Sequence, residues 1–228
     1  QPSPMIEYQT GDILKADAQA LVNTVNCVGV MGKGLALQFK LKYPENFRAY
    51  AKVCNKGELE PGRLFVFDRG QLFEADQQPR YIVNFPTKTH WRPPSKLDYI
   101  EHGMEALVNE VQQRGIKSVA IPPLGCGNGG LDWEDVETII RRHMEALPDT
   151  RVVLYPPGYE PSATDIEAKT KRPNMTPGRA LVIKLLDIYQ ESGYRHGTLE
   201  VQKLAYLLQA AGHDLRLEYR AGHYGPYA

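Results

Sequence analysis

The chain has 228 residues, and its 27 Lys and Arg balance its 27 Asp and Glu, so it carries no net charge at pH 7. This balance excludes a basic surface over the whole protein that would attract nucleic acid, but it leaves local basic patches open. Its length fits one sizeable domain and a smaller second one, and no apolar stretch approaches the ~20 residues of a membrane helix. Its three cysteines form no CxxC pair and its six histidines lack chelating spacings, so we expect a reduced cytoplasmic protein without a metal, a cofactor or a membrane partner.

The N-terminal two thirds of the sequence alternate between short β-rich runs and helical patterns. The first four residues lack the basic and apolar regions of a secretory signal, so the native start is expected at Met5. Such alternation is typical of an α/β sheet covered by helices on both faces. Strands are expected at Ile6–Gln9, Ala20–Asn23, Leu64–Phe67, Tyr81–Phe85, Ser118–Ile121 and Val152–Tyr155. Helices are expected from Gly34 toward Tyr43, from Pro44 to near Gly57, over Lys96–Arg114 and from Trp133 to Leu147.

The character of the sequence changes after Tyr155. A polar stretch through Pro177, rich in Pro, Thr and Lys, has no apolar period and predicts a linker. Beyond it, apolar spacing predicts two short helices, and a strand is expected at Leu215–Tyr219. The helices are marked by Val182, Leu185, Leu186 and Tyr189, and by Leu204, Leu207, Leu208 and Ala211. These elements bury little on their own, so we expect a small, incomplete helical domain that continues beyond Ala228. The expected bounds are 5–157 for the first domain, 158–177 for the linker and 178–228 for the helical domain.

A first glycine-rich segment, Gly29-Val30-Met31-Gly32-Lys33-Gly34, stands between an expected strand and an expected helix. Backbone amides in such a turn, together with the start of a helix, form an anion site that suits a phosphate. The segment is not a Walker loop, because Lys33 is followed by Gly34 where a Ser or Thr should hold magnesium. A tight turn without a ligand is the alternative interpretation.

A second glycine-rich segment, Gly125-Cys126-Gly127-Asn128-Gly129-Gly130, follows the strand Ser118–Ile121 and precedes the helix from Trp133. Its GxGxGG spacing and its late position argue against the dinucleotide fingerprint of a Rossmann dehydrogenase. Two glycine loops at the ends of two strands suit a pyrophosphate held from both sides. A tight turn that binds no ligand is again the alternative interpretation.

A third segment, Thr87-Lys88-Thr89-His90-Trp91-Arg92, leaves the strand Tyr81–Phe85 at what should be the same edge of the sheet. Ligands bind at such edges in α/β proteins, so Lys88 is placed to reach a ligand held by the glycine loops, although a solvated charge is the ordinary role of a loop lysine. His90, Trp91 and Arg92 are candidate DNA contacts, because a base stacks on an aromatic ring while cations hold phosphates. Trp91 covering the core is the alternative.

Several of these segments together resemble one known family. Tyr8–Leu14 and Ala18–Asn26 resemble the opening of a macrodomain, and the similarity continues in order over about residues 5–157. Within that family, Pro86-Thr87-Lys88 and Gly125-Cys126-Gly127 resemble the branch whose members remove ADP-ribose from protein or DNA. Lys203–Tyr206 followed by Tyr224-Gly225-Pro226 is similar to the start of a helical domain of antitoxins, which favours the DNA-directed members. The resemblance implies a mixed central sheet flanked by helices on both faces.

The resemblance also implies a pocket for ADP-ribose. Asp12 should accept a hydrogen bond from the adenine amino group beside Ile13, Asn26 should bind the distal ribose, and Tyr155 should lie beside the adenosine or ribose. A turn or cap for Asp12 and core packing for Tyr155 are the alternatives. Further contacts to the diphosphate and ribose are expected from Gly32, Lys33, Gly34, Leu35, Thr87, Pro123, Gly125, Cys126, Gly127, Asn128, Gly129 and Gly130.

Lys88 matches the catalytic lysine of this branch, and Asn26 is the second candidate, for orienting the reacting ribose. An unprotonated amine can attack the anomeric carbon, expel the modified group and form an imine that water resolves. The protein-directed relatives carry a catalytic Asp two residues after the Gly-Cys-Gly, where this chain has Gly129. Asp132 is a substitute by position, but capping of the following helix is the favoured interpretation.

The implied function is that of an antitoxin that hydrolyses ADP-ribose from thymidine in single-stranded DNA. Its expected partners are ADP-ribose, ADP-ribosylated single-stranded DNA, and a cognate ADP-ribosyltransferase toxin bound through the C-terminal region. A non-catalytic ADP-ribose reader and a hydrolase of protein-linked ADP-ribose remain as alternatives.

Overall fold

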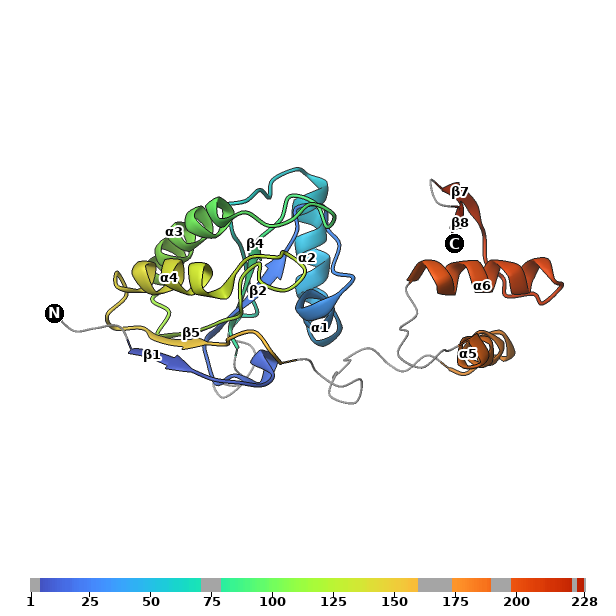
Figure 1. Ribbon diagram of the computed structural model, residues 1–228, viewed down its shortest axis with the longest axis horizontal. Coiled ribbons are helices and arrows are strands. Elements are labelled where there is room, and N and C mark those ends of the chain that lie inside the picture. The colour runs from blue at the N-terminus through green and yellow to red at the C-terminus, as the bar shows by residue number, and fades with distance from the viewer. Residues whose placement is uncertain (1–4, 71–78, 160–173, 190–197, 223–224, 228) are drawn as a thin grey trace. The chain divides into compact units, whose positions relative to one another are not determined.

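A computed structural model describes residues 5–70, 79–159, 174–189, 198–222 and 225–227 of the chain. The chain divides into two compact units, Gln1–Thr170 and Lys171–Ala228 (Figure 1). None of the described helices combines the length and the apolar composition that crossing a membrane requires.

The first unit is built on a six-stranded mixed sheet in the order β1-β6-β5-β2-β4-β3. All neighbouring pairs are parallel except β3 and β4, which are antiparallel. The strands are β1 (Met5–Tyr8), β2 (Ala20–Val25), β3 (Phe65–Asp68), β4 (Tyr81–Pro86), β5 (Ser118–Ile121) and β6 (Arg151–Leu154). The expected mixed sheet is confirmed, and each strand lies within about two residues of its predicted range.

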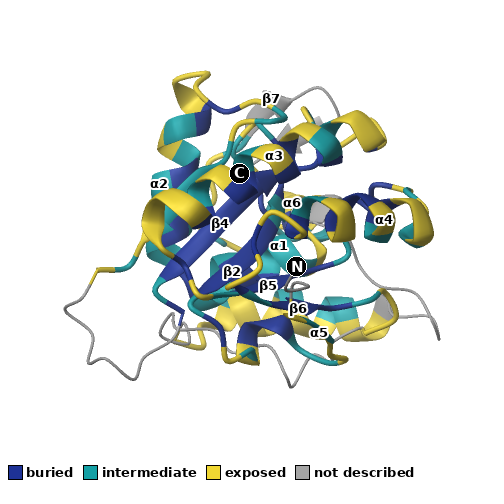
Figure 2. Cartoon of the chain, turned by 90° about the vertical axis from the view of Figure 1, so that its left-hand side faces the viewer, coloured by how far each residue is buried: buried dark blue, intermediate teal, exposed yellow. Residues whose placement is uncertain are grey.

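Helices cover both faces of this sheet because successive strand residues point to opposite sides. Ala20 and Val22 of β2 belong to the core cluster under α3 and α4, whereas Leu21 belongs to the cluster that also holds Phe39 of α1. The helices are α1 (Gly34–Lys42), α2 (Pro44–Asn55), α3 (Leu97–Arg114) and α4 (Trp133–Met144), with a short 3-10 turn η1 at Ile13–Lys15. In Figure 2 the central strands are almost wholly buried between these layers.

The ends of the helices follow local signals in the sequence. α3 stops at Gly115, which has a φ of 62° in the left-handed region that glycine favours. α4 begins after Asp132, whose side chain accepts a hydrogen bond from the amide of Glu134, so its expected role as a cap is confirmed. α4 ends at Met144 and not at Leu147, as the apolar pattern had predicted, because Leu147 reaches the core from the turn after the helix.

The second unit contains α5 (Pro177–Tyr189) and α6 (Thr198–Ala210), both in the predicted positions, and a small hairpin of β7 (Arg220–Gly222) and β8 (Gly225–Tyr227). The prediction of a strand at Leu215–Tyr219 is wrong. Arg216 has a φ of 54°, which breaks an extended backbone, and the Gln209 side chain binds both the amide and the carbonyl of Leu217 in place of a partner strand. Most of the predicted linker, residues 160–173, and Tyr224 lie outside the described residues.

Candidate functional site

Three loops meet at one edge of the sheet. β5, β2 and β4 are adjacent and parallel, so the segments that follow them emerge side by side. We call residues 26–33 the first glycine loop, residues 87–96 the lysine loop and residues 122–132 the second glycine loop. The three segments that the sequence predicts to bind a ligand therefore lie at the same edge of the sheet.

Hydrogen bonds join the lysine loop to both glycine loops. The amide of Cys27 donates to the carbonyl of Thr89 at 3.2 Å, and the amide of Ser95 donates to the carbonyl of Gly129 at 3.0 Å. The second glycine loop also approaches the start of α1, because a Cβ placed on Gly34, the first residue of that helix, would lie 3.6 Å from Nδ2 of Asn128. The three segments form one connected structure.

The first glycine loop is organised by Asn26, which is 8% exposed. Its Oδ1 accepts hydrogen bonds from the amides of Val28 and Val30, and its Nδ2 donates to the carbonyl of Val30 at 2.7 Å. These bonds wrap the loop around one carboxamide, and they leave one N–H of Nδ2 for another acceptor. Asn26, which we expect to bind the distal ribose, therefore also holds the first glycine loop in its conformation.

The first glycine loop leads into the amino terminus of α1. Lys33 occupies the cap position without a side-chain hydrogen bond to the first turn, and Gly32, Lys33 and Gly34 are exposed. The first amides of a helix have no intrahelical acceptor and carry a partial positive charge, so an uncapped helix start of this kind attracts an anion. The half-buried Leu35 follows in the same turn.

The second glycine loop is closed by its own backbone. The amide of Leu131 donates to the carbonyl of Gly125 at 3.0 Å, and that of Gly130 donates to the carbonyl of Gly127 at 3.1 Å. Within the described part of the chain, the amides of Gly127, Asn128 and Gly129 donate to no protein group, and Gly127 and Asn128 are exposed. Consecutive unpaired amides on a rigid turn are suited to a phosphate or ribose oxygen. Pro123 and Cys126 are half-buried within the same loop.

Gly129 is buried, and no side chain fits at its position. A Cβ there would lie 2.2 Å from the carbonyl oxygen of Gly125 and 2.3 Å from Oγ of Ser95, closer than real contacts allow. An acidic side chain at this position is therefore excluded by the shape of the loop. The buried Ser95 hydroxyl, which has no partner among the described residues, fills the space that such a side chain would enter.

Lys88 projects from the lysine loop toward the second glycine loop. Its Nζ donates to the carbonyl of Asn128 at 2.6 Å and lies 3.5 Å from the carbonyl of Trp91. These two carbonyls accept two of the three N–H groups of the lysine side chain. The half-buried side chain thus brings a potential nucleophile to the junction of the loops, beside the buried Thr87.

Two cysteines near the lysine loop are poor nucleophiles. Burial, with a smaller effect of the Asp132 charge, raises the pKa of Cys126 to about 11. Burial, with a smaller effect of Cys54, raises the pKa of Cys27 to about 12. Both thiols are protonated at neutral pH, and a thiol is far less reactive than a thiolate. No group of three His, Cys, Asp or Glu side chains suited to a metal occurs among the described residues.

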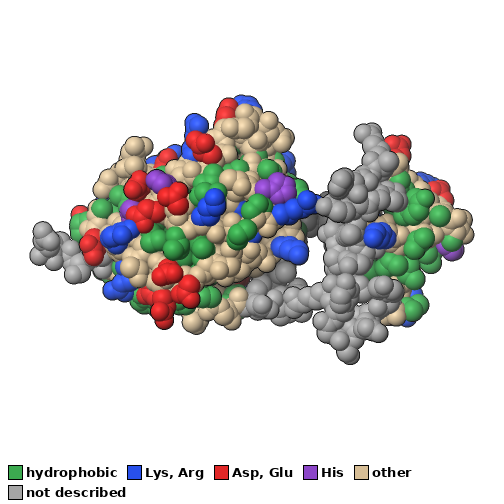
Figure 3. Space-filling view, turned by 45° about the horizontal axis from the view of Figure 1, so that its top comes forward, with side chains coloured by type: hydrophobic (Ala, Val, Ile, Leu, Met, Phe, Trp, Pro, Cys, Tyr) green, Lys and Arg blue, Asp and Glu red, His purple; other side chains and the backbone are tan. Residues whose placement is uncertain are grey.

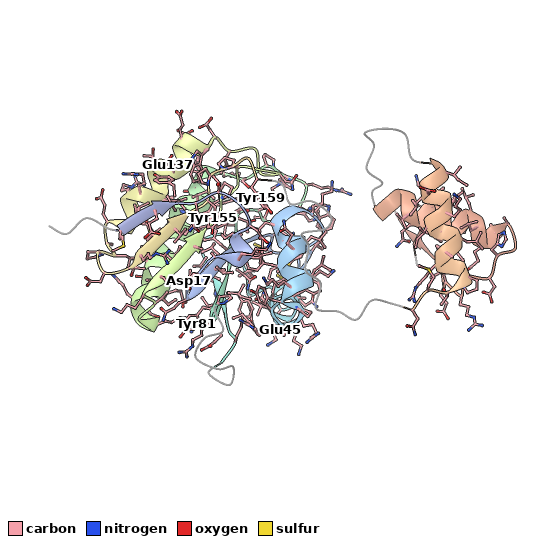
Figure 4. All side chains as sticks on the ribbon, turned by 90° about the horizontal axis from the view of Figure 1, so that it is seen from below. Asp17, Glu45, Tyr81, Glu137, Tyr155 and Tyr159 are labelled. Carbon is pink, nitrogen blue, oxygen red and sulfur yellow. The ribbon has the colours of Figure 1, made fainter. Side chains whose placement is uncertain are left out.

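Asp12, Ile13 and Tyr155 lie together at the ends of the neighbouring strands β1 and β6, and Figure 4 labels Tyr155. Asp12 caps η1 by accepting from the amide of Leu14 at 2.9 Å. Tyr155 is 6% exposed and donates to Oε1 of Gln9 at 2.6 Å, while burial and then the Asp12 charge raise its pKa. Capping and core packing are therefore roles that these residues have in the structure. They lie at the ends of β1 and β6, and β6 is the neighbour of β5, the strand that leads into the second glycine loop.

The DNA-contact candidates lie at the outer end of the lysine loop. Trp91 is 50% exposed, so it does not cover the core, and its ring centroid lies 3.7 Å from that of His90. The amide of Arg92 donates to Nδ1 of His90 at 3.3 Å. On the face of the first unit that Figure 3 shows, acidic and basic side chains are interspersed, so any contact with a polyanion is local.

A buried polar group behind the site was missed by sequence reasoning. Asn46 and Tyr50 lie on α2, and both are fully buried. Asn46 pairs with Asn84 of β4, and Tyr50 contacts Asn26. In the sequence, Asn46 and Tyr50 stand four residues apart in an amphipathic helix, a spacing that indicates a common buried face but not its polar partners.

Comparison with known proteins agrees with the fold. The Macro domain family matches residues 22–140. A Thermus aquaticus protein named DNA ADP-ribosyl glycohydrolase is 49% identical over 98% of this chain and 61% of its own length. The solved macrodomain of Mycobacterium tuberculosis DarG is 57% identical with a TM-score of 0.65, over 68% of this chain and all of that one. Thermosipho africanus DarTG in complex with ADP-ribose is 34% identical with a TM-score of 0.61, over 71% of this chain and 44% of that one.

The class of the protein follows from the mixed sheet, from the three loops after its parallel strands, and from these similarities. The chain belongs to the macrodomain family, and its similarity is to DarG-type members of that family. The chain spans about three fifths of the length of the curated relatives that it matches over nearly all of its own length.

Proposed function

We propose that this protein is an ADP-ribosyl glycohydrolase that removes ADP-ribose from thymidine in single-stranded DNA, and that it acts as the antitoxin of an ADP-ribosyltransferase. The names of its relatives support DNA as the substrate. The observation that carries the hydrolase proposal is the position of Lys88, whose Nζ reaches Asn128 between the loops that suit a diphosphate and a ribose. A pure ADP-ribose reader needs no amine there.

In the proposed mechanism, the two glycine loops hold the diphosphate and the distal ribose, and Asp12 holds the adenine. The Lys88 nitrogen gives its electron pair to the anomeric carbon, the glycosidic C–N bond breaks, and the departing thymine takes a proton. Opening of the ribose ring gives an imine. Addition of water to the imine then releases ADP-ribose and restores the amine. Asn26 orients the ribose through its remaining N–H.

Two substrates and the free ligand ADP-ribose distinguish this function from its alternatives. The protein should restore the unmodified strand from a single-stranded oligonucleotide that carries ADP-ribosyl thymidine. Release from a protein carboxylate in preference to the oligonucleotide would favour the protein-directed hydrolase. Tight binding of free ADP-ribose with no release from either substrate would identify a reader and would end the hydrolase proposal.

Bulky residues at the exposed glycines should prevent binding. A Cβ on Gly127 would meet no protein atom within 4 Å, and one on Gly32 would make only an ordinary contact, at 3.6 Å. Gly127→Val and Gly32→Val should therefore fold normally while they block the approach of the diphosphate to the backbone, which we expect to weaken ADP-ribose binding by about 100-fold or more. Calorimetry measures this directly. Unchanged affinity in both folded variants would place the ligand in another crevice.

The second unit is proposed to bind the cognate toxin, a DarT-like ADP-ribosyltransferase. Its helices expose apolar side chains such as Ile188 at 70% and Leu207 at 60%, as a partner surface would. None of the proposed pocket residues lies in this unit. Removal of residues 162–228 should therefore leave activity on modified DNA within about twofold and weaken co-purification of the toxin. Loss of hydrolysis in the shortened protein would show that the second unit completes the active site.

A further inference from the structure

We propose that Tyr50 is a positioning residue that determines which end of the Asn26 carboxamide faces the ligand. The inference rests on the proposed function for the identity of that ligand, ADP-ribose. It assigns a role to a fully buried side chain that contributes no atom to the surface of the pocket.

The Tyr50 hydroxyl lies against the first glycine loop, where it contacts Asn26 and the amide of Gly29, and it also lies beside Cys54 of α2. Its oxygen is 2.7 Å from the backbone oxygen of Asn26 and 2.9 Å from Oδ1 of the same residue, so its one proton is donated to this pair of oxygens. Burial raises the pKa of Tyr50, which keeps the phenol protonated and a donor.

The other bonds of Asn26 require the same orientation of its carboxamide. The amides of Val28 and Val30 donate to Oδ1, at 3.1 and 3.3 Å, and Nδ2 donates to the carbonyl of Val30. Rotation of the carboxamide by half a turn would place Nδ2 against two backbone donors. Oδ1 is thus surrounded by donors from inside the protein, and the remaining N–H of Nδ2 is the group left for a ligand.

Helix α2 holds Tyr50 firmly in this place. Asn46, one turn earlier on the same buried face, exchanges hydrogen bonds with Asn84 of β4, at 2.8 and 3.3 Å. Asn84 also accepts from Nδ2 of Asn23 on β2 at 3.2 Å. The helix is therefore fixed to the two strands that lead into the first glycine loop and the lysine loop. A rigid support of this kind preserves the geometry of a binding group.

The consequence is chemical. Asn26 offers its ligand a donor only, so it recognises an acceptor oxygen of the distal ribose and does not accept a proton from it. This hydrogen bond from Asn26 positions the anomeric carbon of the distal ribose relative to Lys88. Tyr50 determines the direction of that hydrogen bond. Without the phenol hydroxyl, Oδ1 of Asn26 would lose one of its three hydrogen-bond donors, and the first glycine loop would lose one of its links to α2.

A double-mutant cycle tests the inference. Tyr50→Phe should weaken binding of free ADP-ribose, measured by calorimetry, by about tenfold in the wild-type protein and by less than about twofold in Asn26→Ala, because the phenol acts through that carboxamide. Hydrogen exchange of the Val28 and Val30 amides, measured without a ligand, should accelerate in Tyr50→Phe. Equal losses in both backgrounds, or unchanged exchange and affinity, would overturn the proposal.

Two further variants complete the experiment. Tyr81→Phe is the matched control, since Tyr81 is buried at the opposite end of β4 from the lysine loop, and it should change neither readout (Figure 4). Asn26→Asp keeps the side-chain volume but lacks the N–H, so it should lose binding as fully as Asn26→Ala even if Tyr50→Phe folds poorly. Wild-type affinity in Asn26→Asp would contradict the inference. A wild-type protein that binds ADP-ribose yet releases none from DNA would refute the proposed hydrolysis alone.

Discussion

Lys88→Ala should abolish release of ADP-ribose from DNA, with a loss of at least about 1000-fold in kcat, while the affinity for free ADP-ribose stays within about tenfold of wild type. The amine acts on the barrier of the reaction, whereas the backbone of the two glycine loops supplies most of the ground-state binding. Single-turnover kinetics and calorimetry on the same preparation measure the two effects separately.

Lys88→Arg should be as inactive as the alanine variant, although it preserves the positive charge. A guanidinium remains protonated and has no electron pair for attack. Lys117→Ala is a suitable control, because Lys117 lies before the first residue of β5, at the end of the sheet away from the site. If Lys88→Arg retained turnover, the role of Lys88 would be electrostatic and the covalent mechanism would be wrong.

Gly129→Asp should lose both binding and turnover, even though it adds the acid that the resemblance to protein-directed members implies at this position. Its Cβ would overlap the Gly125 carbonyl and the Ser95 hydroxyl, at 2.2 and 2.3 Å, and the first of these is backbone that cannot move aside without opening the loop. We expect a loss of about 2–4 kcal/mol in the free energy of unfolding and at least a tenfold loss in affinity.

The neighbouring glycine provides the control for that variant. Gly127→Ala adds the same methyl group where no protein atom lies within 4 Å, so its midpoint of thermal unfolding should match that of wild type. Equal thermal stability in Gly129→Asp and wild type would show that the second glycine loop rearranges easily. The steric exclusion of an acid at this position would then fail as an explanation.

The sheet and the meeting of the three loops at one of its edges were predictable because their signals are local. Glycine-rich segments directly after β-rich runs indicate loops at strand ends, and parallel pairing then brings those loops together. The helix end at Gly115 and the cap at Asp132 follow from the conformations that these residue types favour.

Other features depend on contacts that a linear pattern does not contain. The bonds of Tyr50 to Asn26 join residues 24 positions apart, and an aromatic residue on a buried helix face predicts packing and not hydrogen bonding. The exclusion of a side chain at Gly129 depends on Ser95, which lies in another loop. The false strand at Leu215–Tyr219 arose because the alternation of apolar and charged residues does not reveal the left-handed backbone of Arg216.

Chemical trapping of the intermediate tests the central role of Lys88 most directly. The protein would be mixed with single-stranded DNA bearing ADP-ribosyl thymidine, quenched with borohydride within a single turnover, digested and analysed by mass spectrometry. An imine on Lys88 would be reduced to a stable amine, so we expect one ADP-ribosyl adduct on Lys88, formed together with the unmodified strand. Release of the unmodified strand with no adduct on Lys88, or with the adduct on another residue, would contradict the proposed mechanism.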